Sequence, residues 1–449
     1  MHTRPTLPER WLIYAAALPV TVAIFGFGGV YSYIWTPVDI ALFACFLILV
    51  WRQALAAAPL VKHVVYWPML GWGGLIFLQW SLHWSFYPGA TLTGFIKLAG
   101  CGCVFYLALQ ASAHYGRLRR LAWWVWLLCG VLALDALLQF FSSRYYIYGF
   151  HNATYASPVG PFVYHNHFAG CMELLLPVAV AMSFRWEVSP EAVWMRWLRR
   201  GLFPALGVAA MVISRSRGGL LVLIFDLCLT ALVFAPELRR NRRSWQVGLI
   251  SLALLVVFAF IANLRPLFQR LARFSVHSVG LHSRIMVALA CLRIFLHYPW
   301  VGTGFNTFAT IYPAFQLFDN GSVWLYAHND YAQMLAETGL AGALCVAAFL
   351  CIVLIGFWRC WRQQESHQPA ITRRSLQLAA YIAMAGFLFH SYGDFEFHAP
   401  ANALLFFLIS GIALAPISPG NRQRRAVEAG VQRSESGLHP THPRTAKNT

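Results

Sequence analysis

Charged residues are scarce in this chain of 449 residues. Only 11% of them are Asp, Glu, Lys or Arg, whereas an average soluble domain has about 25%. Hydrophobic residues make up 59% of the chain and aromatic residues 16%. A soluble fold of this length cannot bury so much apolar surface and stay in solution. The composition therefore excludes a soluble enzyme, a disordered protein and a nucleic-acid-binding domain, and it indicates a polytopic membrane protein.

Acidic residues are the scarcest charged group. There are 16 Asp and Glu against 34 Lys and Arg, which gives a formal net charge of +18. The basic residues gather in short clusters between apolar runs, as they do in the cytoplasmic loops of membrane proteins. The 10 cysteines show neither zinc spacing nor the pattern of a secreted disulfide framework. We expect them to be small apolar core residues, and we expect no nucleic-acid partner.

The apolar runs predict an all-α membrane domain of about 12 transmembrane helices, each needing roughly 20 apolar residues or somewhat fewer. The predicted spans cover residues 11–30, 37–51, 64–82, 90–110, 121–141, 168–184, 201–214, 218–235, 246–264, 338–357, 376–392 and 401–416. This membrane domain comprises residues 1–417. The remaining segment, 418–449, is rich in Arg, Ser, Gly and Pro, and we expect a disordered basic cytoplasmic tail.

The distribution of Lys and Arg predicts the orientation. With a cytoplasmic N-terminus most basic residues fall on the inner side, and both termini are cytoplasmic. The long loop 265–337, in which residues 282–297 form an amphipathic helix, then faces outwards, towards the periplasm of a bacterium. The connection 393–400, with Asp394, Glu396 and His398, lies on the same side. Because the inner loops show arginine clusters but no motif that indicates chemistry, we expect the active surface outside.

The charged residues within predicted spans include four that we place in the outer half of the membrane. They are Lys97, Asp135, Glu173 and Asp226. A charge inside the bilayer costs several kcal/mol unless it is paired or hydrated. The matching depth of Lys97 and Asp135 on neighbouring spans predicts an ion pair. The four residues either join helices structurally or line a hydrated cavity open to the outside.

The segment Ser214-Arg215-Ser216-Arg217-Gly218-Gly219 forms a tight outer hairpin. Guanidinium groups match the geometry of phosphate oxygens. The following helix would point its N-terminal amides and the positive end of its dipole at the same place. This predicts an anion site at the membrane surface, with contact to lipid headgroups as the alternative.

A second motif, Ala327-His328-Asn329-Asp330-Tyr331, stands where the long loop enters a span. His328 can act as a general base, because the ordinary pKa of histidine is near neutral and an adjacent carboxylate or amide can orient the ring. Alternatively, Asn329 or Asp330 caps the helix and His328 faces headgroups.

Two further segments contain candidate residues. Arg284, in the sequence His282-Ser283-Arg284, provides a third outer guanidinium. His165 and His167, with Glu173 further along the same span, suggest metal ligands, but their spacing is poor for one helix face. We therefore expect no metal ion.

These segments resemble the superfamily of O-antigen ligases and Wzy-type O-antigen polymerases. The resemblance covers roughly residues 155–400 and is carried by VYHNHFAGCMELLLP at 163–177, SRSRGG at 214–219, HYPWVGTGFNTF at 297–308 and AHNDYAQMLAETGLAG at 327–342. It implies a GT-C-like glycosyltransferase of the bacterial inner membrane. Such enzymes act on the periplasmic face, use a glycan linked to undecaprenyl pyrophosphate, and need neither metal, cofactor nor nucleotide sugar. Their acceptors are lipid A-core, another lipid-linked repeat or a protein.

The resemblance also implies roles for individual residues. His328 matches the essential histidine that activates the acceptor hydroxyl. Arg217 and Arg284 match the arginines that hold the donor pyrophosphate, whereas Arg215 is a neighbour that the motif does not require. Asn329, Asp330, His165, His167 and Glu173 are possible supporting residues.

Two alternatives remain at the level of sequence. A transporter or flippase for the same lipid-linked glycan should show inverted repeats and broken helices near the midplane, whereas the charges here lie near one surface. A peptidoglycan polymerase of the rod-shape type lacks the His-Asn-Asp element. Within the superfamily the sequence does not distinguish ligase from polymerase.

Overall fold

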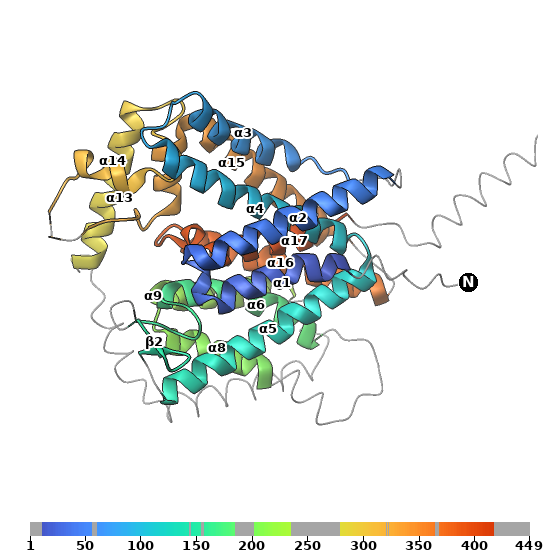
Figure 1. Cartoon of the computed structure of the whole chain (residues 1–449). Coiled ribbons are helices and arrows are strands. Elements are labelled where there is room, and N and C mark those ends of the chain that lie inside the picture. The colour runs from blue at the N-terminus through green and yellow to red at the C-terminus, as the bar shows by residue number, and fades with distance from the viewer. Residues whose placement is uncertain are drawn as a thin grey trace, which may run out of the picture. The chain divides into compact units, whose positions relative to one another are not determined.

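The computed structural model describes residues 11–55, 61–142, 145–153, 157–184, 202–234, 279–319, 321, 323–363 and 368–416. These residues are mostly helical (Figure 1), so the predicted all-α class is confirmed at that level. The strands described there are two-residue strands, β1 (Tyr146–Ile147) and β2 (His151–Asn152), paired antiparallel. The predicted span 246–264 and the predicted tail 418–449 lie outside the described residues.

Most of the helices correspond to predicted apolar runs with shifted ends, whereas two lie in the predicted long loop. They are α1 (Trp11–Phe25), α2 (Ser32–Leu55), α3 (Tyr66–Ser81), α4 (Pro88–Ser112), α5 (Tyr115–Ser142), α6 (His165–Phe184), α8 (Phe203–Ser214), α9 (Arg217–Val233), α13 (Val279–His297), α14 (Phe308–Phe315), α15 (Asp330–Arg362), α16 (Gln368–His390) and α17 (Pro400–Ala413). Short 3-10 turns occupy Phe27–Gly29 and Glu396–His398. Within the described part, α2, α4, α5 and α15 are long and apolar enough to cross a membrane, and α1, α8 and α17 are shorter apolar helices.

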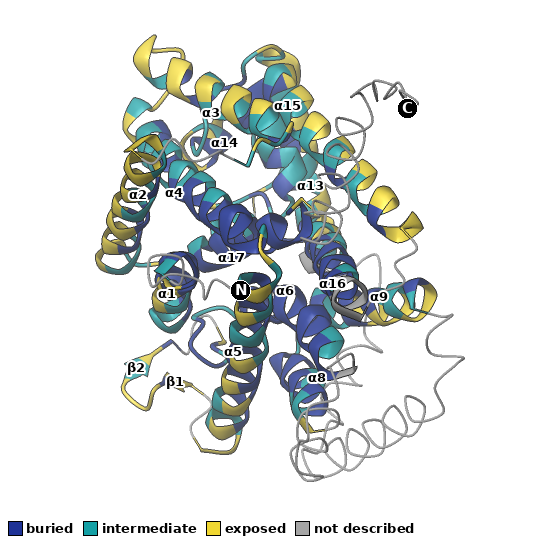
Figure 2. Ribbon diagram, turned by 90° about the vertical axis from the view of Figure 1, so that its right-hand side faces the viewer, coloured by how far each residue is buried: buried dark blue, intermediate teal, exposed yellow. Residues whose placement is uncertain are grey.

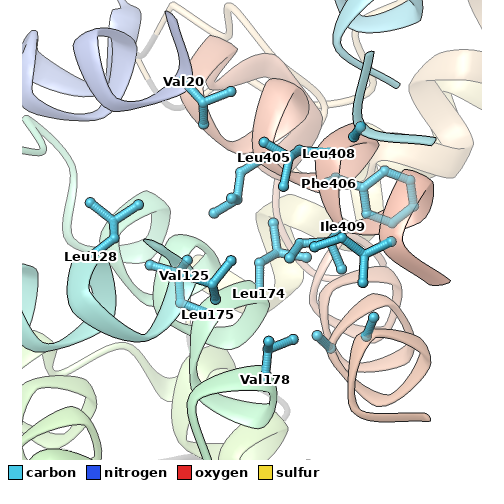
Figure 3. Packing of buried hydrophobic residues seen from close by; sticks show 14 of the residues in the cluster. Val20, Val125, Leu128, Leu174, Leu175, Val178, Leu405, Phe406, Leu408 and Ile409 are labelled. Carbon is cyan, nitrogen blue, oxygen red and sulfur yellow. The ribbon is translucent and has the colours of Figure 1, made fainter. Parts of the chain in front are cut away.

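The centre of the bundle is built around α17. Every residue of this helix from Ala401 to Ala413 is buried, and it packs against α4, α16 and α6. Figure 3 shows Leu405 and Ile409 of α17 meeting Leu174 of α6. By contrast, α2, α3 and α15 expose many apolar side chains (Figure 2). In water such exposure would be costly, so this surface suits contact with lipid.

The long loop has a hydrophobic core of its own. α13 and α14 lie together at one end of the bundle (Figure 1), and buried Val287, Ile294, Phe308 and Tyr312 form a cluster between them. The helix predicted over 282–297 is thus present as α13. Because α13 also packs along α15, the loop is fixed to the helix that carries the His328 motif at its start.

α15 is kinked at Gly339, where the helix packs closely against the preceding loop. Gly339 has a left-handed φ of +61°, and a Cβ there would lie 2.6 Å from the backbone of Trp300. The close approach lets Leu340 N donate to Pro299 O at 2.7 Å. The side chain of Glu337 accepts from Asn306 N at 2.8 Å and Phe308 N at 3.0 Å. These contacts give the Gly-Thr-Gly-Phe and Glu-Thr-Gly segments a structural role.

The predicted ion pair between Lys97 and Asp135 is wrong. Lys97 lies over the ring of Trp35 at 4.7 Å, and its acidic neighbour is Asp39, which packs against Gly100 one turn further along α4. Asp135 instead faces Gly160 of the connection before α6. Matching depth does not decide which helices are neighbours, and α4 packs more closely on α2 and α17 than on α5.

Candidate functional site

His328 stands at the junction of the long loop and α15. Asn329 is the N-cap of this helix, and its side chain accepts from Ala332 N at 2.9 Å. His328 itself has φ +50°, in the left-handed region that few non-glycine residues occupy. Such strained conformations persist where surrounding contacts hold them, and they cluster at functional sites.

Asp394, in the connection between α16 and α17, orients the imidazole of His328. The distance from His328 Nδ1 to Asp394 Oδ1 is 2.9 Å. The side chain of His328 is 22% exposed and that of Asp394 only 1%. No hydrogen bond among the described residues engages His328 Nε2. A ring held through one nitrogen with the other nitrogen free has the arrangement of a general base.

Sequence reasoning did not assign Asp394 to the site. It expected an orienting group beside His328, but Asn329 caps the helix and Asp330 accepts from His398 Nδ1 at 2.9 Å. The sequence feature that could have indicated Asp394 is its position in an outer connection, on the same predicted side of the membrane as His328.

Asp394 is also bound by groups from two other segments. Arg284 Nη2 lies 3.6 Å from Asp394 Oδ2, Asn166 Nδ2 donates to the same oxygen, and Phe395 N donates to Oδ1 at 3.0 Å. Burial alone would raise the pKa of Asp394, but the hydrogen bond with His328 and the charge of Arg284 together hold it below its ordinary value. The carboxylate therefore remains ionised at neutral pH.

Aromatic rings enclose this pair. Phe395 stacks between Tyr326, at 4.6 Å between centroids, and Tyr164, at 5.7 Å. The His328 ring stands edge-on to Phe395 at 4.6 Å and to Trp324 at 5.5 Å. The packing leaves few orientations for the imidazole and limits access of water to its Nδ1 side.

A cavity of about 760 Å³ connects the predicted residues. The guanidinium-bearing residues Arg215, Arg217 and Arg284 line it together with His328 and Asp394. Its further polar lining consists of Tyr164, His165, Asn166, Asn329, His390 and Tyr392. Residues that lie as far apart in sequence as Tyr164 and Asp394 thus line one cavity. Its walls include α9, α13 and α16.

The hairpin 214–219 satisfies part of its own hydrogen-bonding potential, which the sequence did not indicate. Arg215 ends α8 in the left-handed conformation with φ +57°. Ser216 is the N-cap of α9, and its Oγ accepts from Gly219 N at 3.0 Å. One of the helix amides expected to face an anion is therefore already bonded. The glycines serve packing, since a Cβ on Gly218 would collide with His390 and one on Gly219 would lie 2.7 Å from Ala169.

The remaining candidates do not form one cluster. His165 lines the cavity. His167 is buried beside Phe395, with a centroid distance of 4.8 Å. Glu173 is fully buried, and its Oε1 lies 2.9 Å from His390 Nδ1.

A possible metal-ligand group among the described residues differs from the one the sequence suggested. It consists of His390, Asp394 and Glu396, whose ligand atoms lie within 4.8 Å of one another. All three are already engaged, because His390 Nδ1 is paired with Glu173, Asp394 is bonded to His328, and Glu396 accepts from Asn402. Hydrogen bonds within the protein thus account for most of this group.

Comparison with protein families places this geometry in a known context. The profile described as O-antigen ligase matches residues 202–347, a range that contains the three arginines and His328 but ends before Asp394. Comparison with curated proteins gave no significant match. Members of this family are ligases and polymerases that transfer glycans, which supports an enzyme of glycan assembly in a membrane. Residues 202–347 match the O-antigen ligase family, and the resemblance of this chain to the superfamily of O-antigen ligases and Wzy-type polymerases is confirmed.

Proposed function

We propose that this protein is a bacterial inner-membrane glycosyltransferase that takes a glycan from undecaprenyl pyrophosphate on the periplasmic face. The product belongs to surface polysaccharide, either O-antigen or exopolysaccharide, and the reaction is that of an O-antigen ligase or a Wzy-type polymerase. The observation that carries the proposal is the single cavity shared by Arg217, Arg284 and the His328–Asp394 pair.

The cavity provides the two groups that the transfer needs. Arg217 and Arg284 hold the pyrophosphate of the donor, whose negative charge grows as the bond between the sugar C1 and the phosphate oxygen breaks. Preorganised guanidinium groups stabilise that charge most where water is scarce. Arg215 adds positive charge at the rim.

His328 acts on the acceptor, whereas the arginines act on the donor. Its Nε2 takes the proton of the acceptor hydroxyl while Asp394 holds Nδ1–H and stabilises the imidazolium that forms. The acceptor oxygen bonds to C1 as the pyrophosphate leaves with the electron pair of the broken bond. A displacement in one step inverts the anomeric centre. No step of this route uses a metal ion.

The apolar wall of the same cavity suits the polyprenyl chain. Leu221 of α9, Ile285 and Leu289 of α13 and Phe389 of α16 line it, and each is 44–57% exposed. This apolar surface belongs to the same cavity as the arginines that hold the pyrophosphate in this proposal. Both termini are cytoplasmic in this proposal, and membrane lipids surround the bundle.

A reconstituted transfer assay tests the proposal. The full-length protein in proteoliposomes receives undecaprenyl-pyrophosphate-linked glycan and, in separate arms, lipid A-core, a second lipid-linked repeat or an acceptor protein. Transfer in one arm, lost in His328→Ala, supports the proposal and identifies the acceptor. Movement of the glycan lipid across the membrane with no transfer in any arm would instead indicate a flippase.

In cells, the banding of surface polysaccharide separates the two enzyme classes. A deletion strain that leaves a single repeat on the core lacks a polymerase. A deletion strain with free long chains and bare core lacks a ligase.

A further inference from the structure

A second histidine, His390, faces the cavity from the end of α16. Its side chain is only 3% exposed, and it lines the cavity next to Gly218. The atom nearest to a Cβ built on Gly218 is His390 Nε2. The imidazole therefore lies against the first turn of α9, directly beside Arg217.

The other nitrogen of His390 is held by a buried carboxylate. His390 Nδ1 lies 2.9 Å from Glu173 Oε1 and 3.2 Å from Glu173 Oε2. Glu173 is fully buried on α6, and a buried carboxylate is stable in its ionised form only when it is paired with a positive group. Among the described residues its hydrogen-bond partner is His390.

Glu396 is a further acidic group beside His390. Its Oε1 lies 3.6 Å from His390 Nδ1, and Asn402 Nδ2 donates to its Oε2 at 2.8 Å. Burial raises the pKa of Glu396 well above its ordinary value and so disfavours its charged form. Glu173, whose Oε1 lies closer to His390 Nδ1 than that of Glu396, is the carboxyl group that matches a charge on His390.

His390 Nε2 has no partner within the described protein. No hydrogen bond to this atom exists among the described residues. With Nδ1–H directed at Glu173, Nε2 is either a bare acceptor or the second donor of an imidazolium. A diphosphate in the adjacent cavity favours the imidazolium, because an anion repels a lone pair and attracts an N–H.

We propose that His390 is a third binding group for the diphosphate of the lipid-linked donor, which donates an Nε2–H hydrogen bond to the leaving group while Glu173 fixes its Nδ1. The inference rests on the proposed function and deepens it. His328 then serves the acceptor and His390 the leaving group, on either side of Asp394. No proton transfer by His390 is required, since a hydrogen bond alone stabilises the charge that develops.

Equilibrium binding of two lipids to full-length protein in nanodiscs tests the role of His390. The probes are undecaprenyl pyrophosphate and undecaprenol, which share a tail and differ in the diphosphate. His390→Gln should weaken binding of undecaprenyl pyrophosphate about 10- to 100-fold, the range for a lost charge-assisted hydrogen bond. Binding of undecaprenol should not change. Glu173→Gln should weaken diphosphate binding in the same direction while keeping the imidazole in place.

His398→Gln is the matched control, because it replaces a partly buried histidine whose two nitrogens are already bonded. It should leave both affinities unchanged. If wild-type protein does not bind undecaprenyl pyrophosphate, the proposed function itself fails. If wild type binds it and folded His390→Gln and Glu173→Gln bind it equally well, the inference about His390 is overturned and the proposed function stands. If His390→Gln does not fold, Glu173→Gln decides by the same criterion.

Discussion

Two histidine–aspartate pairs flank Phe395, and their surroundings differ. His328 is bound to Asp394 on the side of the arginine-lined cavity. His398 is bound to Asp330, also at 2.9 Å, on the side of Lys97 and Asp39. Both pairs consist of the same residue types, and both have the same distance between histidine Nδ1 and aspartate Oδ1. These two properties therefore cannot explain a difference in function between the pairs.

The difference lies in the second ring nitrogen. His398 Nε2 is 2.9 Å from Gln333 Nε2. Because Gln333 Oε1 accepts from Ala327 N at 2.9 Å, the amide must donate and His398 Nε2 must accept. Both ring nitrogens of His398 are therefore engaged in hydrogen bonds, and this saturated pair joins the start of α15 to the turn at 396–398. His328 Nε2 has no hydrogen-bond partner among the described residues and faces a cavity, which allows proton transfer.

The largest expected effect follows from removing that free nitrogen. His328→Gln should lower the rate of glycan transfer by about 10²- to 10⁴-fold, the usual contribution of a general base. Transfer is measured in proteoliposomes at equal amounts of inserted protein. A rate within threefold of wild type would remove His328 from the catalytic role.

The arginines should not tolerate lysine. Arg217→Lys and Arg284→Lys should each lower transfer about 10²-fold, nearly as much as the alanine variants, because a point charge cannot reproduce the forked contact. Arg215→Lys is the matched control on the same hairpin and should be mild. A benign Arg217→Lys would leave this residue only a role in binding lipid headgroups.

Asp394 should matter through the orientation of His328. Asp394→Asn should lower transfer about 10- to 100-fold while the affinity for the donor changes less, since the variant keeps the shape but loses the charge that stabilises the imidazolium. Comparing kcat with the KM for the donor separates the two effects. A change confined to KM would contradict the orienting role.

The depressed pKa of Asp394 gives a pH-dependent effect on stability. Such a group stabilises the fold above its unfolded pKa of about 3.9, and this contribution is lost as the pH falls towards the folded value. The difference in Tm between wild type and Asp394→Asn should be constant from pH 8 to about 5 and should narrow below about pH 4. A difference that grows on acidification would have the wrong sign.

The saturated pair should affect stability and not catalysis. His398→Gln should lower the free energy of unfolding by about 1–3 kcal/mol, because it leaves buried polar partners unsatisfied. Transfer per folded molecule should stay within a few-fold of wild type. A loss of transfer as large as that of His328→Gln would abolish the distinction between the two pairs.

Chelation should have the smallest effect. If hydrogen bonds fully account for His390, Asp394 and Glu396, EDTA should leave the transfer rate of the purified protein unchanged. Inhibition by EDTA with recovery on addition of zinc would show that this group holds a metal ion.

The helices were predictable because lipid-facing spans need long apolar runs, and α4 extends only two residues beyond its predicted run at each end. The predicted span 338–357 covers only the part of α15 that follows the kink at Gly339, whereas the alternative in which Asn329 caps the helix is confirmed. The Lys97–Asp39 contact was also missed, because it depends on which helices pack together.

For the site, sequence motifs pointed to Arg217, Arg284 and His328, and the structure brings them to one cavity. Their roles remain proposals. The partner of His328 could not be deduced, because Asp394 is 66 residues away and no local spacing connects the two. His390 carried no signal either, since a single histidine at the end of an apolar span is common.

The most direct measurement is labelling of the long loop in intact cells with a membrane-impermeant maleimide. Val323, which is 87% exposed, is replaced by cysteine, and Leu55, which is 72% exposed at the predicted inner end of α2, serves as the matched position. Native cysteines set the background in the wild type. We expect Val323→Cys to be labelled in intact cells and Leu55→Cys to be labelled only after permeabilisation. The reverse pattern would place His328 and the arginines on the cytoplasmic side and contradict transfer at the periplasmic face.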